Sequence, residues 1–364
     1  MNLMELLTQP AAVSGARQSV FDHSPESLRA LFGSWEQPAY RAAQLLEWVY
    51  QKGAKTYEEM SNLPKALRAR LAEDLPLFQS AIEHRQESSD GTIKLLLRWP
   101  DGATSECVLI PDEDRRTACI STQVGCPVGC VFCASGLGGL QRNLTAGQVV
   151  EQAMRVRHLV EADMRLSNIV FMGLGEPLAN YAATVQALRT INAEWGMGIG
   201  ARKITVSTVG LPGQMKRLAD EKLQITLALS LHAPTDELRQ QIIPWAERVR
   251  IDALVEACNY YFATTGREVT LEYILLGGLN DSETHAKALA DVSKRMRSNV
   301  NLLAYNPVAG LPYERPTDRA AMRFLSTLRN RGVNAHLRRS RGLDIDAACG
   351  QLRRRAGGGV IITA

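Results

Sequence analysis

Three of the seven cysteines in this 364-residue chain lie close together, at Cys126, Cys130 and Cys133. A structural zinc site has four protein ligands, and its cysteines usually come as two closely spaced pairs. This group of three has no fourth cysteine at a matching distance. Three thiolates can instead hold a [4Fe–4S] cluster and leave one iron open to a substrate or cofactor. The spacing Cys-x3-Cys-x2-Cys therefore indicates an iron–sulfur cluster with one open coordination site.

Several predicted strands are followed, at their carboxyl ends, by glycines and polar side chains that could bind a ligand. Gly175 and Glu176 follow the run NIVFMG, where glycine lets the backbone approach a ligand and the glutamate can meet a charged amine. The other candidates at strand ends are Ser207, Ser230, Leu231, His232 and Asn306. Since parallel barrels place their active sites at this end of the strands, we predict a cofactor-binding site there. For His232 by itself, a structural hydrogen bond is the first expectation.

The alternative to a cluster is a zinc ion whose fourth ligand is distant in sequence, such as His158 or Cys258. The binding groups at the strand ends make this alternative weaker. Cys258 also lies in a helix-like stretch among apolar neighbours, as structural cysteines often do.

Strands and helices in regular alternation would position these candidates. Six strand-like runs rich in β-branched residues occur, at 117–122, 168–173, 203–208, 224–233, 268–276 and 300–306. Segments of helical period separate them, such as 145–163, which begins with a capping box of Thr145 and Gln148. Such alternation predicts a parallel sheet with right-handed crossovers. Because six strands are two short of a closed barrel, the predicted fold is α/β, a partial (β/α)6 TIM-like barrel.

A small helical domain and a β-hairpin are predicted before the barrel. Apolar residues recur at helical spacing within 24–75, and the runs 92–99 and 103–110 are strand-like with a turn between them. The expected segments are an N-terminal helical domain at 1–85, a hairpin linker at 86–115, the partial barrel at 116–340 and a C-terminal tail at 341–364.

The composition is that of an ordinary globular protein, with 45% hydrophobic and 22% charged residues. No run of about 18 apolar residues occurs, and the start of the chain lacks the features of a secretory signal. We therefore expect no membrane span and a cytoplasmic location. A net charge of +4 permits an anionic partner but does not require one. Seven cysteines are too sparse for a disulfide scaffold in a chain of this length.

With Phe132 just before its third cysteine, the cysteine motif is similar to the signature of radical S-adenosylmethionine (SAM) enzymes. Nearly the whole chain resembles the RlmN family of bacterial RNA methyltransferases. The motifs that carry this resemblance are SSDGTIK at 88–94, VGCPVGCVFC at 124–133, MGLGEP at 172–177, SLHAP at 230–234, NLLAYNP at 301–307 and RGLDIDAACGQL at 341–352. The resemblance implies a [4Fe–4S] cluster, two SAM per turnover, and methylation of carbon 2 of adenine-2503 in 23S rRNA and of adenine-37 in certain tRNAs.

The resemblance also implies roles for three residues outside the cluster. Cys349 would take a methyl group from one SAM as a thiolate nucleophile. A second SAM, bound at the open iron, would yield a 5′-deoxyadenosyl radical that removes hydrogen from the S-methyl group, and the resulting carbon radical would add to the adenine. Glu106, in SECVLIP, is then the candidate base for the ring proton. Cys119 would attack the sulfur of Cys349 and form a transient disulfide that frees the product.

Each of these three roles has a structural alternative. Glu106 could be an exposed strand residue, and Cys119 and Cys349 could be buried core thiols. Cys107 alternates with Glu106 along the predicted strand, so it should face the other way, and we expect it to be structural.

The partners that the resemblance implies are 23S rRNA and tRNA, whose target adenine must be exposed or flipped toward the cluster. The segments 336–342 and 351–355 are candidates for phosphate contacts, with the N-terminal helices as a second RNA-facing surface. The other implied partner is an electron donor such as flavodoxin or ferredoxin. We expect a monomer that does not bind membranes.

Two other functions stay open on the sequence alone. The C8-methylating relative (Cfr) resembles this chain in the cluster and in both auxiliary cysteines, and only the motifs at 88–94 and 341–352 favour carbon 2. A non-catalytic RNA-binding module with a structural metal site is the alternative from another class. Such a module would need neither Cys119 nor Cys349.

Overall fold

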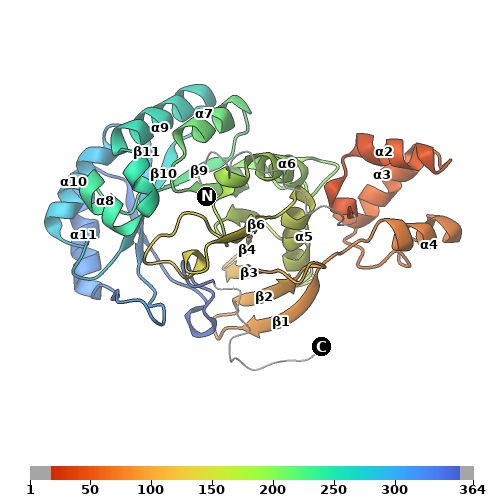
Figure 1. The fold of residues 1–364 in the computed structure, drawn as a ribbon, viewed down its shortest axis with the longest axis horizontal. Coiled ribbons are helices and arrows are strands. Elements are labelled where there is room, and N and C mark those ends of the chain that lie inside the picture. The colour runs from red at the N-terminus through yellow and green to blue at the C-terminus, as the bar shows by residue number, and fades with distance from the viewer. Residues whose placement is uncertain (1–17, 353–364) are drawn as a thin grey trace.

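One ten-stranded mixed sheet forms the centre of the computed structural model, which describes residues 18–352 (Figure 1). Three antiparallel strands form one edge: β1 (Ala81–Glu87), β2 (Ile93–Arg98) and β3 (Thr104–Asp112). After β3, seven mutually parallel strands continue the sheet: β4 (Arg115–Cys119), β7 (Asn168–Phe171), β8 (Ile204–Thr208), β9 (Thr226–Ser230), β10 (Val269–Leu275), β11 (Ser298–Ala304) and β12 (Ala335–Arg338). A separate small sheet pairs β5 (Gln123–Gly125) with β6 (Leu140–Asn143).

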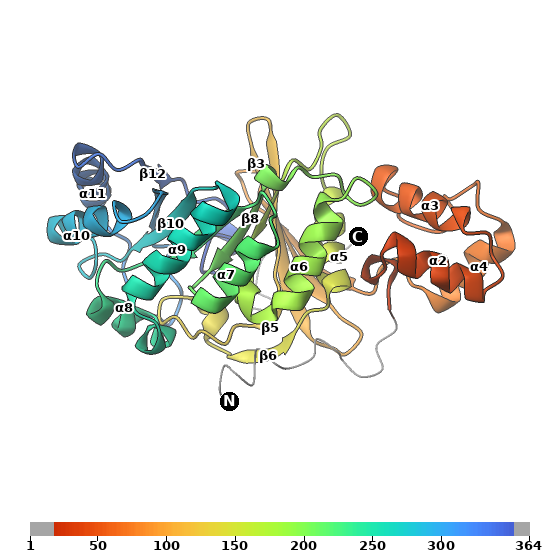
Figure 2. The same cartoon turned by 90° about the horizontal axis from the view of Figure 1, so that it is seen from above.

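Helices follow the first six parallel strands, which confirms the predicted partial (β/α)6 barrel. They are α5 (Ala146–Arg157), α6 (Tyr181–Asn192), α7 (Pro212–Asp220), α8 (Asp236–Ile242), α9 (Ile251–Thr265), α10 (Glu283–Ser293) and α11 (Asp318–Asn330). Figure 2 shows α5, α6, α7 and α9 side by side along one face of the sheet. The main hydrophobic core lies between these helices and the strands. Within residues 18–352, no helix is both long and apolar enough to cross a membrane.

The seventh parallel strand, β12, was not among the predicted strands. Its four residues include a histidine and an arginine, and only Ala335 is buried. A strand this short and polar lacks the hydrophobic pattern from which a strand is predicted. Its place at the edge of the barrel comes from pairing with β11, in which Val300 lies opposite Ala335.

The predicted hairpin is confirmed, and it has a third strand. β2 and β3 pair in antiparallel register around the turn at 99–102, with Leu95 opposite Cys107. β1 lies across the boundary expected at residue 85. Its side chains are half-buried or exposed without alternation, so the sequence carries no period-two signal there.

The N-terminal helices pack at one end of the molecule, beside α5 (Figures 1 and 2). They are η1 (Val20–Asp22), α2 (Pro25–Ser34), α3 (Tyr40–Leu46), a π-helical turn at η2 (Glu47–Gln51) and α4 (Lys65–Asp74). The Asp22 carboxylate accepts hydrogen bonds of 3.0 Å from the Thr145 hydroxyl and from the Gly147 N–H, at the start of α5. A carboxylate is favourable there because it meets the free N–H groups and positive dipole of the helix start.

The predicted capping box of α5 is confirmed, whereas the predicted end of this helix is wrong. The Thr145 hydroxyl accepts from the Gln148 N–H at 3.1 Å, and the Gln148 side chain accepts from the Thr145 N–H at 3.2 Å. The helix ends at Arg157 instead of 163, where a bond from the Leu159 N–H to the Val156 carbonyl tightens the last turn. Leu159 then packs against the main core.

Arg239 on α8 ties together the loops that follow β8 and β9. Its side chain is 0% exposed and donates to the carbonyls of Leu231, Val249 and Val209, the first two at 3.2 and 3.4 Å. A buried guanidinium is tolerated only when such acceptors surround it.

Replacing Arg239 with Met should destabilise the fold, because buried carbonyls lose their donor. We expect the free energy of unfolding to fall by about 3 kcal/mol. Urea unfolding, followed by circular dichroism, measures this change as a lower midpoint. Arg202→Met is the matched control, since Arg202 is exposed. Equal midpoints for the two variants would contradict this role of Arg239.

Candidate functional site

A cavity of about 230 Å³ collects most of the predicted site residues at the carboxyl ends of the barrel strands. The predicted residues that line it are Cys119, Cys126, Cys130, Cys133, Gly175, Glu176, Ser207, Ser230, His232, Asn306 and Cys349. Two predicted residues, Glu106 and Leu231, do not line it. Strands in parallel end at the same edge, which is why residues so distant in sequence meet here.

The three clustered cysteines lie on a loop that closes on itself beside the cavity. The Cys126 N–H donates to the Gly139 carbonyl at 3.1 Å, and the Cys133 N–H donates to the Cys130 carbonyl at 3.1 Å. Burial raises the pKa of the Cys126 thiol to about 12 and that of the other two thiols as well. Thiolates at these positions therefore need a strong positive charge beside them, as a metal centre supplies.

The donor set fits a cluster better than a single ion. Between residues 18 and 352, no three His, Cys, Asp or Glu side chains are placed to hold one metal ion together. In a [4Fe–4S] cluster each thiolate binds a different iron, so the sulfurs need not converge on one point. The zinc alternative is wrong, because neither residue that it proposed as the fourth ligand lies near the three cysteines. His158 contacts the Gly53 carbonyl, Cys258 is buried in the main core, and neither lines the cavity.

His232 holds its ring against the cysteine loop and makes the expected structural hydrogen bond. Its Nδ1 accepts from the Ile274 N–H at 3.1 Å, and its ring meets the Phe132 ring edge-on at 5.2 Å between centroids. Burial lowers the pKa of His232 to about 3, so the imidazole is neutral. With Nδ1 as the acceptor, Nε2 carries the proton.

Gly175 and Glu176 join the loop after β7 to its neighbours. Gly175 has φ of +104°, and a Cβ there would lie 2.6 Å from the Gln123 side chain. The absence of a side chain therefore lets the Gly175 backbone pack closely against Gln123, whereas the sequence predicted a close approach to a ligand. The two carboxylate oxygens of Glu176 accept the N–H groups of Leu178 at 3.1 Å and Val209 at 2.8 Å. Burial raises the pKa of Glu176 to about 7. Glu176 therefore anchors the loops after β7 and β8 as well as lining the cavity.

A row of polar side chains crosses four adjacent strands on the cavity side. The hydroxyls of Ser207 and Ser230 lie 3.2 Å apart. Ser230 is in register with Glu272, whose Oε1 accepts from the Asn301 amide at 3.1 Å. Glu272 is buried and lines the cavity, but it was not among the predicted site residues. The signal was the charged residue in the middle of the run VTLEYILL at 269–276, whose other residues carry no charge.

Arg338 on β12 connects this row with the two auxiliary thiols. Its guanidinium lies 3.9 Å from the Glu272 carboxylate and lines the same cavity as Cys119 and Cys349. Burial raises the pKa of the Cys119 thiol to about 12 and also raises that of Cys349, while the Arg338 charge opposes both shifts. The sequence assigned this arginine to an RNA-facing segment, but it faces the cavity.

Asn306 holds the tail that carries Cys349. Its amide nitrogen donates to the Cys349 carbonyl at 3.4 Å, and its Oδ1 accepts from Arg315 at 3.0 Å and from the Ser340 hydroxyl at 2.8 Å. Most of its hydrogen-bonding capacity is therefore used on protein. Cys349 is an exposed residue, although the protein around its thiol displaces enough water to raise the pKa of that thiol.

Glu106 is buried on the side of β3 that faces the tail, so the alternative of an exposed strand residue is wrong. It is 1% exposed and pairs with the Lys94 ammonium at 3.2 Å. Val108, two residues on, packs with Cys119 beneath the tail. Cys107 points the other way into the main core, as predicted. Leu231 is fully buried, and its N–H donates to the carbonyl of Glu272.

Comparisons with known proteins show the family. The model of the Radical SAM superfamily matches residues 120–289, and that of the ribosomal RNA large subunit methyltransferase N-terminal domain matches residues 19–76. A protein of Thermosynechococcus vestitus named "Probable dual-specificity RNA methyltransferase RlmN" is 48% identical over 91% of this chain and 96% of its own length. A protein of the same name from Rhodopirellula baltica is 43% identical over 98% of this chain and 96% of its own. The chain belongs to the RlmN family.

A solved structure shows that the similarity of the RlmN-family chain to known proteins includes its fold. The crystal structure of a radical SAM methyltransferase from Sphaerobacter thermophilus superposes with a TM-score of 0.91 at 46% identity, covering 93% of this chain and 100% of that one. As a radical SAM protein, the RlmN-family chain uses a [4Fe–4S] cluster and SAM. Cys126, Cys130 and Cys133, which line the cavity, fit as the ligands of such a cluster.

The buried His158 should lower the free energy of unfolding of the RlmN-family protein in weak acid. Burial lowers the pKa of His158 to about 4, below its ordinary 6.5. Between these values the unfolded chain binds a proton and the folded chain does not, so the free energy of unfolding decreases as the pH falls from about 7 to about 4. Urea unfolding at several pH values measures this slope. The variant His158→Gln should lose part of it, and an unchanged slope would contradict the assignment.

Replacing Glu176 with Gln should weaken SAM binding. The amide offers one acceptor oxygen where the carboxylate offers two, so its NH2 group faces the N–H of either Leu178 or Val209. We expect the dissociation constant for SAM to rise about tenfold, as measured by calorimetry on protein with its cluster. Glu268→Gln, at an exposed position, is the control. Unchanged affinity in Glu176→Gln would show that these loops do not shape the SAM site.

Proposed function

We propose that this chain methylates carbon 2 of adenine in 23S rRNA and in certain tRNAs, with Cys349 as the methyl carrier. One observation carries the proposal: Cys349 and Cys119 line the same cavity as the three cysteines of the cluster loop. A protein that used its metal only for structure would have no need to bring two further thiols to the same place.

Cys349 is the proposed nucleophile. Its thiolate attacks the methyl carbon of SAM, so that the new S–C bond forms as the old one breaks and S-adenosylhomocysteine leaves. Burial raises the pKa of the Cys349 thiol, and the guanidinium of Arg338 counters this, which favours the reactive thiolate. When bound, the [4Fe–4S] cluster would supply the electron that splits a second SAM, so two SAM are used per turnover, and it would take one electron back as the adduct between the S-methylene carbon and adenine loses its ring proton.

Glu106 is the proposed base for the ring proton of adenine. Lys94 holds its carboxylate on the tail side of β3, where burial excludes water. Glu106 lies outside the cavity lining, so the substrate or the tail must bring the ring proton within hydrogen-bond distance of it.

Cys119 is the proposed resolving thiol. Its thiolate attacks the sulfur of Cys349, a disulfide forms, and the bond from that sulfur to the methylene carbon of the product breaks. The electron pair stays with the carbon, which takes up a proton to become the methyl group. A disulfide requires Cα atoms within about 7 Å, and both thiols line one cavity.

RNA is the proposed substrate, and the cavity mouth has the charge for it. Arg339 and Arg341, from the expected segment 336–342, line the cavity beside Arg338. Residues 353–355 of the other expected basic segment lie outside the described residues. Exposed Lys65 and Arg70 on α4 support the second RNA-facing surface. We also propose a monomer in the cytoplasm, reduced by a donor such as flavodoxin or ferredoxin.

Replacing either of the two auxiliary cysteines should block methylation, but each replacement should block it at a different step. Cys349→Ala should abolish product, because no methyl carrier remains. Cys119→Ala should accumulate a covalent protein–RNA adduct, because the bond to Cys349 cannot be broken. Anaerobic assays with SAM, a reductant and an rRNA fragment, read by denaturing gel and nucleoside mass spectrometry, separate these outcomes. Cys258→Ala, in the core away from the cavity, should keep activity, and equal loss in all three variants would contradict the roles.

The same assay separates the other functions that the sequence left open. Mass spectrometry against both methyladenosine standards should find the product methylated at carbon 2, and methylation at carbon 8 alone would move the chain to the Cfr type. A brown protein with about four irons supports the enzyme. A colourless protein with stoichiometric zinc and no product would favour a non-catalytic RNA-binding module.

A further inference from the structure

Lys94 is the one residue of the motif SSDGTIK that has a part in the mechanism so far, yet other residues of the motif contact the tail motif RGLDIDAACGQL as well. We propose that Ser88, Ser89, Asp90 and Lys94 form a clamp that grips the tail loop 341–352 and positions Cys349 at the cavity. Asp344 is the main positioning residue on the tail side. This proposal rests on the proposed role of Cys349 as methyl carrier.

The clamp grips the first half of the tail loop through charged groups. The Ser88 hydroxyl donates to the Asp344 carboxylate at 2.5 Å, and the Ser89 N–H donates to its other oxygen at 3.1 Å. The Asp90 carboxylate accepts the Gly342 N–H at 2.9 Å. Hydrogen bonds with an ionised partner are stronger than neutral ones, so these three contacts outweigh ordinary loop contacts.

Lys94 extends the clamp to the candidate base. Its buried ammonium lies 3.2 Å from the Asp346 carbonyl on the tail and 3.2 Å from the Glu106 carboxylate on β3. The position of the tail and the position of Glu106 are therefore linked through one side chain.

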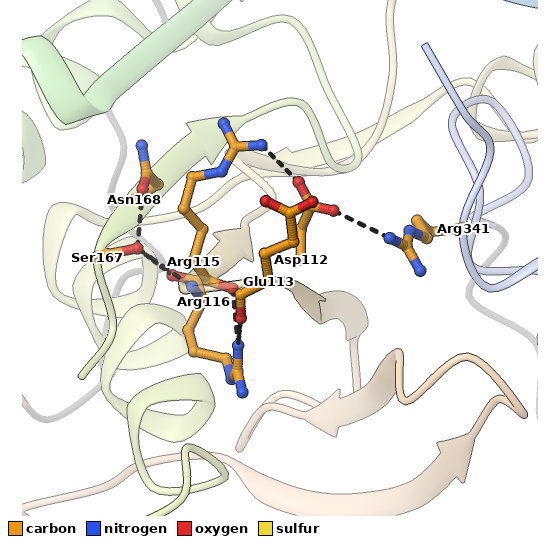
Figure 3. Close-up of polar contacts among 7 residues, drawn as sticks. All are labelled: Asp112, Glu113, Arg115, Arg116, Ser167, Asn168 and Arg341. Atoms are coloured by element: carbon orange, nitrogen blue, oxygen red, sulfur yellow. Dashed lines mark hydrogen bonds and ion pairs between the residues drawn. The ribbon is translucent and has the colours of Figure 1, made fainter. Parts of the chain in front are cut away.

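An ion pair at the edge of the hairpin adds to this grip. Figure 3 shows Arg341, at the start of the tail loop, reaching the Asp112 carboxylate, which also binds Arg115 of its own hairpin. The Arg341 guanidinium donates to Asp112 at 2.9 Å. Because both side chains are about one-third exposed, this pair contributes less than the contacts of the buried Lys94 side chain.

The second half of the tail loop is held from the opposite side, by the barrel. The Ala134 N–H donates to the Gly350 carbonyl at 2.8 Å, the Ser135 hydroxyl donates to the Leu352 carbonyl at 3.1 Å, and Gln351 donates to the Pro307 carbonyl at 3.1 Å. Cys349 lies between these two sets of contacts. Releasing the hairpin end would let the thiol swing while the other end stays attached.

The backbone of the tail is shaped to fit the clamp. Gly342 has φ of +64°, and a Cβ there would lie 2.8 Å from Ala347 and 2.9 Å from Thr92. Glycine adopts this conformation without strain and leaves room for Thr92, which belongs to the motif SSDGTIK. The two motifs therefore match in shape as well as in charge.

The clamp stays charged across the physiological range. The Ser88 hydroxyl and Ser89 N–H lower the pKa of Asp344. Burial alone would raise the pKa of Asp90, but the hydrogen bonds from Thr92, Gly342 and Ser88 hold it at about 2. The clamp therefore does not act as a pH switch near neutrality.

The clamp predicts opposite effects of one substitution on two reactions of Cys349. In the holoenzyme, after turnover with RNA and reduction, Asp344→Ala should slow S-methylation of Cys349 by SAM about tenfold, because the thiol is less often at the cavity. It should also speed maleimide labelling of Cys349 by about tenfold. Peptide mass spectrometry measures both rates. Ser88→Ala should change them less, and the double variant should resemble Asp344→Ala, since both act on one contact.

Two controls separate the clamp from loss of fold. Asp114→Ala removes an exposed carboxylate from the turn between β3 and β4, outside the clamp residues, and should match the wild type. Labelling of the buried thiols Cys107 and Cys258 should not change in Asp344→Ala. Wild-type rates at Cys349 in Asp344→Ala, or faster labelling of the buried thiols as well, would overturn the clamp. Absence of S-methylation in the wild type would instead refute the proposed function, and labelling would still test the clamp.

Discussion

A 2.8 Å hydrogen bond from the Ala134 N–H to the Gly350 carbonyl joins the two parts of this molecule on which the chemistry depends. Ala134 follows the last cysteine of the cluster loop, and Gly350 follows Cys349. The two residues are more than two hundred positions apart in sequence, so nothing local brings them together. The sheet must place the cluster loop at the barrel mouth, and the tail must return across the hairpin, before this contact can form. Cys349 and the three clustered cysteines line one cavity only because both conditions are met.

The cavity favours neutral side chains until a cofactor arrives. Burial raises the pKa values of the cluster thiols and of Glu176, and lowers that of His232, so each of these groups resists carrying charge. The Arg338 charge lowers the pKa of both auxiliary thiols, Cys119 and Cys349, and Arg338 is paired with Glu272. The positive charge that turns thiols into ligands therefore comes with the cluster, while the protein provides the Arg338 guanidinium beside Cys119 and Cys349.

Glu176, Asn306 and His232 show that residues expected to bind a cofactor also hold the loops together. Each makes a hydrogen bond to a backbone group of another segment: Glu176 to Val209, Asn306 to Cys349, and His232 to Ile274 of β10. Such bonds fix the rotamers of the side chains and the loops around them, which is what a site needs to keep its geometry. The substitution of any of them therefore removes a contact that holds the wall of the cavity.

The sequence by itself determined the barrel, the hairpin and the cluster loop. Repeated hydrophobic periods and a fixed cysteine spacing are local patterns, and each is read from a short stretch of chain. It did not predict β1 and β12, which are short or half-exposed strands without such a pattern, or the site residues Glu272 and Arg338. Nor did it place Glu106 beside Lys94, outside the cavity. These features depend on which distant segments pack together, and above all on the return of the tail to the SSDGTIK turn. Only the tertiary structure decides that, because the hydrogen bond between Ser88 and Asp344 joins residues 256 positions apart.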